Sequence, residues 1–331
     1  MAWLVGIDEA GYGPNLGPLV MTAVAWHVPD RPPHADLWQT LRAAVRRHAE
    51  PDDGRLVVAD SKLVYSPARG LGLLEKSVLA ALQCSFVARH GLAHNLNLKS
   101  LLGLLCPTEL LERQQADLHG ELWFAGDTAL PMESEATDIG AAVDRLWDAC
   151  RECGVMVGSC RSIVVCAPRF NELTDSCDSK AAALAWGLTH LLRDSMSRAP
   201  AAEPVAFLID KHGGRNHYGA MLTEALSAGF VWGREEGPER SVYEVDGLDR
   251  PVRITVQPRA DVEHFPVALA SMISKYVREA LMGEFNAFWR QHVADLQPTA
   301  GYPGDSSRFL EQIRPALLKL GVEQRQVWRR K

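Results

Sequence analysis

The sequence contains no run approaching the roughly 20 consecutive apolar residues that a membrane-spanning helix requires. Its N-terminus also lacks the basic stretch followed by an apolar stretch that marks a secretory signal peptide. We therefore expect a soluble, cytoplasmic protein with no membrane partner. The seven cysteines among 331 residues then fit reduced thiols better than a disulfide framework.

An excess of basic residues is also missing. The chain has 35 Lys and Arg against 41 Asp and Glu, a formal net charge of −6. Any binding to nucleic acid would need a local basic patch. Neither a G-x-S-x-G motif nor a Cys–His pattern is present, so a nucleophilic serine or cysteine is not indicated. There are no internal repeats that would indicate a solenoid.

The cysteines supply only one C-x-x-C motif, formed by Cys150 and Cys153. A zinc site usually has a second close pair of cysteines or histidines, and none follows at the usual spacing. A redox motif usually follows a strand, whereas residues 141–149 have helical periodicity. Cys166 lies in an apolar run and is expected in the core. A zinc site is thus the less favoured interpretation of these cysteines.

The N-terminal stretch carries the most information. Residues 3–7 form a short apolar run that predicts a buried strand, and Asp8 and Glu9 follow directly. Neighbouring side chains on a strand point to opposite faces, but the glycines that come next allow a bend through which both carboxylates would reach one ion. Two like charges beside a core strand favour a divalent cation, Mg²⁺ or Mn²⁺, over an unpaired arrangement. A solvated turn is the alternative.

A dinucleotide-binding loop is a second alternative, and it fits poorly. Gly11, Gly13 and Gly17 do not have the G-x-G-x-x-G spacing. Residues 19–28 predict another strand where a nucleotide-binding loop would open a helix.

Two further carboxylates stand at the ends of predicted elements. Asp210 ends the apolar run 204–210, the clearest buried strand in the chain. Asp261 lies between the alternating segment 252–257, a predicted strand, and the predicted helix 265–281. In open α/β sheets, sites form where strands end. A surface aspartate and a helix cap, respectively, are the alternatives.

Several separated blocks resemble one known family. The stretch from Gly6 to Pro18, with its Asp-Glu-Ala-Gly core, is similar to the signature that opens type 2 ribonucleases H, the ribonuclease HII family. Three later blocks resemble that family's other motifs in the same order, and the resemblance covers about two thirds of the chain. These blocks are Asp60-Ser61-Lys62, Ala260-Asp261 with the helix after it, and Gly301-Tyr302-Pro303.

The resemblance implies an α/β, ribonuclease H-like fold with a mixed central sheet and helices on both faces. Residues 1–283 would form the catalytic domain. Segment 90–154 has no counterpart in the family pattern, and we expect it to be an insertion that recognises a substrate or a protein partner. Residues 284–331 would form a helical C-terminal extension.

The family's activity is metal-dependent endonuclease cleavage of RNA in RNA–DNA hybrids or at ribonucleotides embedded in duplex DNA. The products carry a 5′-phosphate and a 3′-hydroxyl. By resemblance, the catalytic residues and ligands of two Mg²⁺ or Mn²⁺ ions are Asp8, Glu9, Asp210 and Asp261. The substrate-binding residues are Gly11, Tyr12, Gly13, Ser61, Lys62, Ser271, Lys275 and Tyr302, with Lys211, His212 and Arg215 as further phosphate contacts.

The chain departs from the family pattern at two places. Tyr12 stands where many members have a basic residue, in the loop that contacts the ribose 2′-hydroxyl. Asp210 is followed by Lys211 and His212 instead of the usual Gly-Asn. Two alternatives therefore stay open: a nuclease of this fold that acts on another structured nucleic acid, and a non-catalytic nucleic-acid-binding protein.

The remaining periodicity predicts the rest of the secondary structure. Strands are expected at 56–59 and 163–166. Helices are expected at 36–49, from Ser66-Pro67 through 82, and at 98–105, 139–150 and 179–192.

Overall fold

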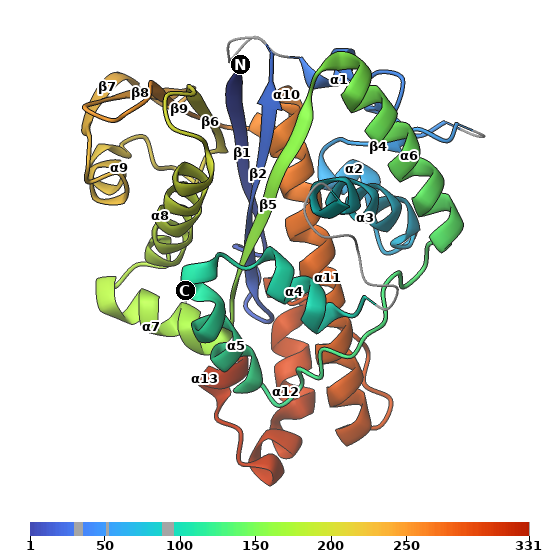
Figure 1. The fold of residues 1–331 in the computed structure, drawn as a ribbon. Helices are drawn as coiled ribbons and strands as arrows, with labels where there is room; N and C mark the ends of the chain where they lie inside the picture. Colours follow the sequence, from blue (N-terminus) through green and yellow to red (C-terminus); the bar gives the residue numbers. More distant parts are fainter. Residues whose placement is uncertain (30–35, 51–52, 88–95, 331) are drawn as a thin grey trace.

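The computed structural model describes residues 1–29, 36–50, 53–87 and 96–330 (Figure 1). Within these ranges, seven strands form one sheet in the order β5-β2-β1-β6-β9-β8-β7. Strand β1 pairs antiparallel with β2 and parallel with β6, and β6 pairs parallel with β9. The bounds are β1 (Ala2–Ala10), β2 (Leu19–Val28), β5 (Met156–Val165), β6 (Val205–Asp210), β7 (Phe230–Glu236), β8 (Ser241–Asp246) and β9 (Val252–Gln257). Because β1, β6 and β9 are parallel, their C-terminal ends lie at the same edge of the sheet.

The central strands are apolar on both faces, as strands covered by helices must be. In β1, Leu4 packs into one hydrophobic cluster, while Trp3, Val5 and Ile7 pack into a second cluster on the opposite face. This period of two follows from the alternation of side chains along a strand. The first cluster lies against α3 (Gly72–Val87), α4 (Leu98–Leu105), α6 (Ala136–Cys153) and α11 (Phe265–His292). The second lies against α8 (Ala181–Arg198) and α9 (Gly219–Ala225).

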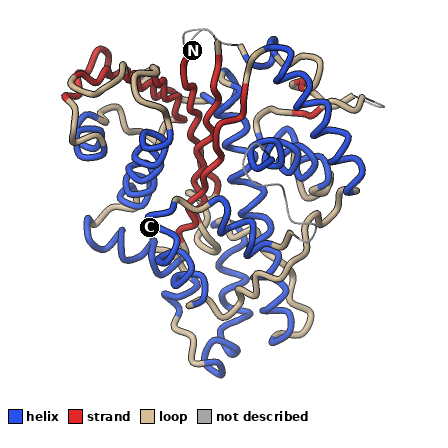
Figure 2. The backbone as a smooth tube through the Cα atoms, viewed as in Figure 1, coloured by secondary structure: helices blue, strands red, loops and turns tan. Residues whose placement is uncertain are grey.

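Figure 2 shows the helices on either side of the strands. The prediction of a mixed sheet with helices on both faces is therefore confirmed. The C-terminal region is helical as well, with α12 (Pro303–Leu320) and α13 (Gln324–Val327). The other elements are α1 (Leu37–Thr40), β3 (Val45–Arg46), β4 (Leu56–Val57), α2 (Ser61–Val64), η1 (Thr108–Leu110), α5 (Leu111–His119), α7 (Ala167–Cys177) and α10 (Ala260–Glu263).

Helix α11 crosses the middle of the sheet at very short range. A Cβ atom at Gly6 would lie 2.2 Å from the backbone carbon of Pro266, so only glycine permits this approach of β1 to the helix. Further along α11, the Ser274 hydroxyl donates a hydrogen bond to the Asp8 carbonyl oxygen at 3.2 Å. These contacts position the carboxylate end of β1.

The helix expected at 36–49 is wrong beyond Thr40. Helix α1 ends there, and Val45 and Arg46 pair parallel with Leu56 and Val57 as the two-stranded sheet β3–β4. The Trp38 indole donates a hydrogen bond to the Val58 carbonyl at 2.8 Å and so joins the two segments. Tertiary pairing has overridden a spacing that also suits a helix.

The helix start expected at Ser66-Pro67 is also wrong, because Ser66 forms an isolated bridge with Gly70 and α3 begins at Gly72. The Glu133 carboxylate accepts hydrogen bonds from the backbone N–H groups of Leu71 and Gly72. This carboxylate, distant in sequence, supplies the cap that the N-terminal N–H groups of a helix need.

The described part of segment 90–154 is packed into the main core, with Leu98, Leu101 and Ile139 in the first cluster. Buried Glu75 of α3 accepts hydrogen bonds from the backbone N–H groups of residues 132, 133 and 134 at 2.6–2.7 Å. The predicted helices at 98–105 and 139–150 are confirmed as α4 and α6. The proposed domain division stays a prediction, and α11 continues without interruption past residue 283.

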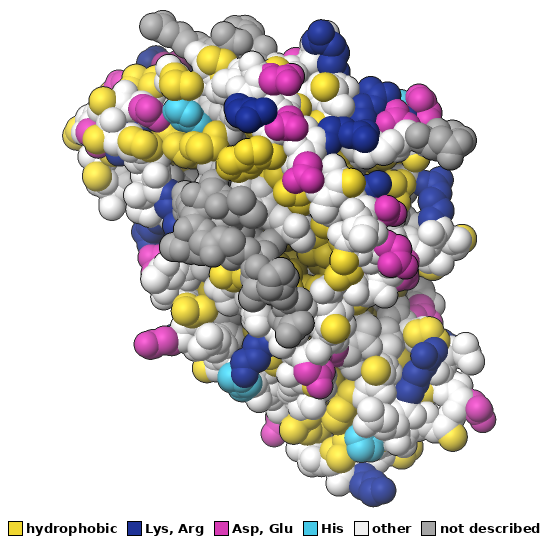
Figure 3. Space-filling model, turned by 45° about the vertical axis from the view of Figure 1, so that its right-hand side comes forward, with side chains coloured by type: hydrophobic (Ala, Val, Ile, Leu, Met, Phe, Trp, Pro, Cys, Tyr) yellow, Lys and Arg dark blue, Asp and Glu magenta, His cyan; other side chains and the backbone are white. Residues whose placement is uncertain are grey.

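The surface face in Figure 3 carries Lys and Arg side chains interspersed with Asp and Glu, without a continuous basic area. No helix in the described ranges has both the length and the apolar character needed to cross a membrane.

Candidate functional site

A cavity of about 510 Å³ contains the four predicted carboxylates, and we call it the carboxylate cavity. Asp8 and Glu9 come from the end of β1, Asp210 from the end of β6, and Asp261 from α10. Segments more than 200 residues apart thus place their acidic side chains around one space, as the parallel arrangement of β1 and β6 requires.

Short backbone contacts hold these side chains. The Asp8 carboxylate accepts a hydrogen bond from the Glu9 N–H at 2.7 Å. The Asp210 carboxylate accepts one from the Ala260 N–H at 2.8 Å, which joins the end of β6 to the start of α10. Strand β1 continues through Ala10, so the chain does not bend immediately after Glu9, and both carboxylates still line the cavity.

Burial dominates the electrostatics of the carboxylate cavity. It raises the pKa of Asp8 well above its usual range, and the charges of Glu9 and Asp210 raise it further. Burial and the charge of Asp210 raise the pKa of Glu9 to about 8. For Asp210, burial raises the pKa to about 6 against the opposing effect of the Ala260 N–H. Burial and the charge of Asp60 also raise the pKa of Asp261. The cluster therefore resists carrying four negative charges by itself.

No ionised basic partner relieves Glu9, whose Oε2 atom is buried and accepts no hydrogen bond from any described residue. The Nε2 atom of His212 lies 4.0 Å from this oxygen. Burial lowers the pKa of His212 to about 4, so the imidazole is neutral at neutral pH and the pair is not an ion pair.

The donor chemistry of the cavity fits a hard divalent cation, because it offers carboxylate oxygens that repel one another and one that has no partner. Among the described residues, however, no three His, Cys, Asp or Glu side chains stand close enough to form a ready metal-binding group. The carboxylates would have to converge around an ion. Cys150 and Cys153 are both free thiols, the first buried and the second exposed.

Six of the eight predicted substrate-binding residues line the carboxylate cavity, and they include two lysines with different surroundings. Lys62 opposes the rise in pKa of Asp210, whereas the Lys275 ammonium is paired with Glu279 at 2.7 Å. The six are Gly11, Ser61, Lys62, Ser271, Lys275 and Tyr302.

Tyr12 and Gly13 do not line the cavity. The Tyr12 ring packs against the second cluster, and the Lys180 ammonium lies 4.6 Å from its centroid. Lys211, His212 and Arg215 are outside the cavity lining as well. The Lys211 ammonium donates its hydrogen bonds to Asn216 and to two backbone carbonyls.

Sequence reasoning missed Asp60, Arg259 and Arg278 in the cavity lining. Asp60 is the first residue of the Asp60-Ser61-Lys62 block. Its position next to Ser61 and Lys62, both predicted to bind substrate, could have indicated that it lines the cavity. Arg278 is 1% exposed and donates hydrogen bonds to the carbonyls of Leu16 and Pro18 at 3.3 Å. No sequence pattern indicates that this arginine holds the loop after β1.

The sequence matches no protein-family model, and no curated protein matches it. Several solved structures are similar at low identity. Ribonuclease HII of Archaeoglobus fulgidus, solved in complex with PCNA, is 14% identical over 98% of this chain and 92% of its own, with a TM-score of 0.42. Ribonuclease H2 of Pyrococcus horikoshii is 13% identical over 98% of this chain and 92% of its own, with a TM-score of 0.43. Bst-RNase HIII, in complex with Mn²⁺, is 17% identical over 99% of this chain and 66% of its own, with a TM-score of 0.41. Similarities at this level do not by themselves assign a family or a function.

Proposed function

We propose that this protein is a metal-dependent endonuclease of the ribonuclease H type. Its substrates would be the RNA strand of RNA–DNA hybrids or ribonucleotides embedded in duplex DNA, with 5′-phosphate and 3′-hydroxyl products. The observation that carries the proposal is the gathering of Asp8, Glu9, Asp210 and Asp261 around one cavity that Lys62 also lines. The resemblance of the sequence blocks to type 2 ribonucleases H supports the same reaction class.

The four carboxylates would hold one or two Mg²⁺ or Mn²⁺ ions. Such ions, when bound, activate an attacking water and stabilise the leaving oxygen in phosphodiester hydrolysis. A cation would also remove the mutual repulsion that raises the pKa values of Asp8, Glu9 and Asp210. Asp60, which also lines the cavity, adds a fifth carboxylate that would strengthen the attraction for cations.

The other lining groups suit a nucleic-acid backbone. Lys62 donates charge-assisted hydrogen bonds to phosphate oxygens, and the Ser61 hydroxyl supplies a neutral donor beside it. The charge of Lys275 is partly neutralised by Glu279. Lys275 would therefore orient a bound phosphate more than attract it. The exposed Tyr302 ring at the cavity edge offers a face for a sugar or base.

The loop after β1 would contact the ribose through its backbone. Gly11 has φ +93°, and a Cβ atom there would lie 2.5 Å from the Pro18 carbonyl oxygen, so glycine is required. The Arg278 guanidinium donates hydrogen bonds to the carbonyls of residues 16 and 18. The carbonyl groups of Leu16 and Pro18 are therefore held in place before any substrate binds.

A second candidate is a nuclease of the same type that acts on another structured nucleic acid. Tyr12 favours it, because its ring is turned into the second hydrophobic cluster and would not contact a phosphate. A protein partner for segment 90–154 stays a prediction. Among the described residues of this segment, the large exposed apolar side chains are Leu104, Leu122 and Trp147, where such a contact would be sought by crosslinking.

The test uses two labelled duplexes with Mg²⁺ or Mn²⁺: an RNA–DNA hybrid, and DNA that carries one ribonucleotide. Cleavage 5′ to the lone ribonucleotide indicates that the loop recognises the junction, and cleavage of the hybrid alone assigns the hybrid as substrate. Asp8→Asn should abolish either activity, and Asp148→Asn, an exposed control on α6, should retain it. Activity that survives in Asp8→Asn would refute the proposal. Cleavage of neither duplex but of a branched substrate would favour the second candidate.

A further inference from the structure

The C-terminal tail, residues 321–330, returns to the loop that follows β1. Leu16 and Trp328 form an antiparallel bridge, and the Arg329 N–H donates a hydrogen bond to the Asn15 carbonyl at 2.8 Å. The Arg329 guanidinium, 1% exposed, donates to the Pro14 carbonyl. The tail is therefore packed and hydrogen-bonded against the proposed substrate loop.

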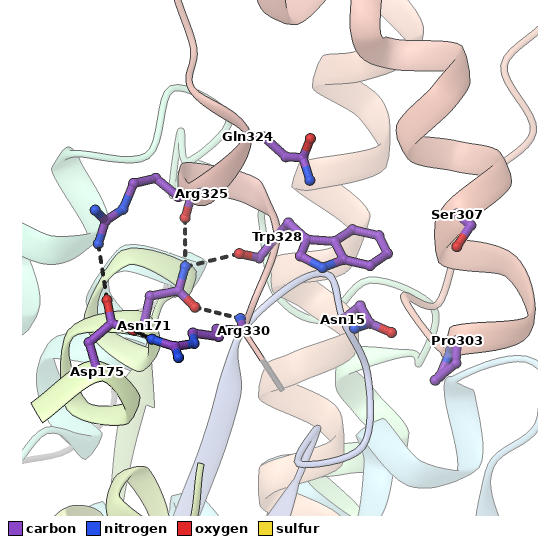
Figure 4. A pocket seen from close by; sticks show the side chains of 9 residues that line it. All are labelled: Asn15, Asn171, Asp175, Pro303, Ser307, Gln324, Arg325, Trp328 and Arg330. Atoms are coloured by element: carbon purple, nitrogen blue, oxygen red, sulfur yellow. Dashed lines mark hydrogen bonds and ion pairs between the residues drawn. The ribbon is translucent and has the colours of Figure 1, made fainter. Parts of the chain in front are cut away.

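Helix α7 holds the tail from the other side. The Asn171 side-chain amide donates to the carbonyls of Arg325 and Trp328, both at 2.9 Å, and accepts a hydrogen bond from the Arg330 N–H at 2.6 Å. Figure 4 shows these bonds converging on Asn171. The backbone of the tail thus uses both N–H donors of the Asn171 amide and one lone pair of its oxygen. These bonds give the tail a defined conformation.

Between the tail, the loop and α12 lies an open cavity of about 700 Å³, which we call the tail pocket. Trp328 presents its indole to it, with Asn15, Gln324 and Ser307 around the ring (Figure 4). Among the described residues, the Trp328 Nε1–H donates no hydrogen bond, and the Gln324 side-chain amide and the Ser307 hydroxyl have no hydrogen-bond partner. An aromatic surface surrounded by unused donors and acceptors suits a flat polar ring such as a nucleobase.

The lining of the tail pocket carries two guanidinium groups and one carboxylate, that of Asp175. Arg325 and Arg330 approach the Asp175 carboxylate at 3.6 and 2.5 Å, and Arg330 also contacts Asp178 at 3.1 Å. All four side chains are largely exposed, and ion pairs of this kind contribute little stability. The guanidinium groups are therefore available to turn toward a phosphate, which they bind in bidentate fashion.

Neighbouring residues of the same two segments line the tail pocket and the carboxylate cavity. Tyr302 lines the carboxylate cavity and Pro303 lines the tail pocket, and consecutive Cα atoms are about 3.8 Å apart. Gly11 likewise lines the carboxylate cavity and Asn15 lines the tail pocket. These two residues are at most about 14 Å apart along the loop. A strand bound in the first cavity would reach the second within a few nucleotides.

We propose that the tail pocket binds one nucleotide of the strand that extends from the carboxylate cavity. The base packs against Trp328 and uses the Gln324 amide and the Asn15 side-chain NH₂ group, whose oxygen already accepts a hydrogen bond from Ser306, while Arg325 and Arg330 contact the phosphate. This inference rests on the proposed nuclease function, because the strand must lie in the carboxylate cavity to extend there.

Photocrosslinking tests the contact independently of cleavage. The Asp8→Asn variant is mixed with hybrids that carry a single 5-iodouracil at successive positions on either side of the expected cleavage site, and crosslinked residues are identified by mass spectrometry. Crosslinks to Trp328 confined to one or two adjacent positions support the proposal, and their absence at every position overturns it. The cleavage assay with unsubstituted protein bears on the nuclease function alone.

Binding measurements separate direct contact from an effect of the tail on the loop. Trp328→Ala should weaken binding of a long hybrid about tenfold, the loss of one base stack. It should leave unchanged the binding of a hybrid truncated before the crosslinked position. Gln324→Ala, which breaks no hydrogen bond in the described structure, should weaken only the long hybrid by about threefold. Trp232→Ala, an exposed tryptophan on β7, is the matched control and should change neither. Equal weakening of both hybrids by Trp328→Ala, or no change with the long one, would overturn the proposal.

Discussion

Replacing Glu9 with glutamine should stabilise the metal-free protein near pH 8 and leave it almost unchanged near pH 4. The pKa of Glu9 is about 8 in the folded protein against 4.5 for an ordinary glutamate. Between these values the folded state binds more protons than the unfolded state, so the free energy of unfolding falls as pH rises. Below the lower value both states are protonated and the penalty is absent.

The magnitude follows from the same pKa. With each pKa unit equivalent to about 1.4 kcal/mol, the upper limit is about 5 kcal/mol. The Glu9 side chain is 15% exposed, and its titration depends on the neighbouring Asp8 and Asp210, so solvent and these neighbours reduce this figure. We expect glutamine to add about 2 kcal/mol at pH 8 in EDTA. Gln is nearly isosteric, so packing should not change.

Urea denaturation of both proteins at the two pH values measures the difference directly. The difference between variant and wild type removes the contributions of other groups, including His212 and Glu121, whose pKa values burial also shifts. Mg²⁺ should stabilise the wild type more than Glu9→Gln. Glu112→Gln, at an exposed position on α5, should show no effect at either pH. An equal gain at both pH values, or none at pH 8, would refute the reasoning.

Three further outcomes are expected from single substitutions, each measured by denaturation and compared with the wild type. Arg329→Ala should lower the free energy of unfolding by about 2–3 kcal/mol, because it leaves the Pro14 carbonyl without its donor and removes packing on Phe170; an unchanged stability would show that the tail does not hold the loop. Glu75→Gln should cost about 2–4 kcal/mol and speed hydrogen exchange at residues 132–134, since an amide replaces a carboxylate that accepts four hydrogen bonds, and normal protection there would contradict this role. Gly6→Ala should cost about 3 kcal/mol or more by forcing α11 away from β1, and a fully stable variant would mean that the close approach is not required.

The central strands β1 and β6 could be predicted from the sequence because each is an apolar run with a carboxylate near its end. Strand β6 and its terminal Asp210 are the clearest example. Strand β7 could not be predicted, since it lies at the edge of the sheet and its side chains, such as Phe230 and Trp232, are mostly exposed. An edge strand without a buried face carries no alternation to detect.

Four of the five carboxylates that line the cavity, all but Asp60, could be expected from the sequence because each stands at the end of a strand or the start of a helix. The groups that hold the site could not be predicted. Arg278 and Arg329 act on the loop after β1 from positions more than 250 residues away, through backbone carbonyls that have no sequence signature. Tyr12 lies outside the cavity because its ring packs against an apolar cluster that α8 and the sheet form together.

The most direct test of the central claim is an anomalous diffraction map of crystals soaked in Mn²⁺. We predict one or two peaks in the carboxylate cavity, about 2–2.5 Å from oxygens of Asp8, Glu9, Asp210 or Asp261. The same soak of an Asp210→Asn crystal should weaken or remove a peak. Manganese bound only outside this cavity, with the positions of the four carboxylates unchanged, would contradict the account of this cavity as a metal centre.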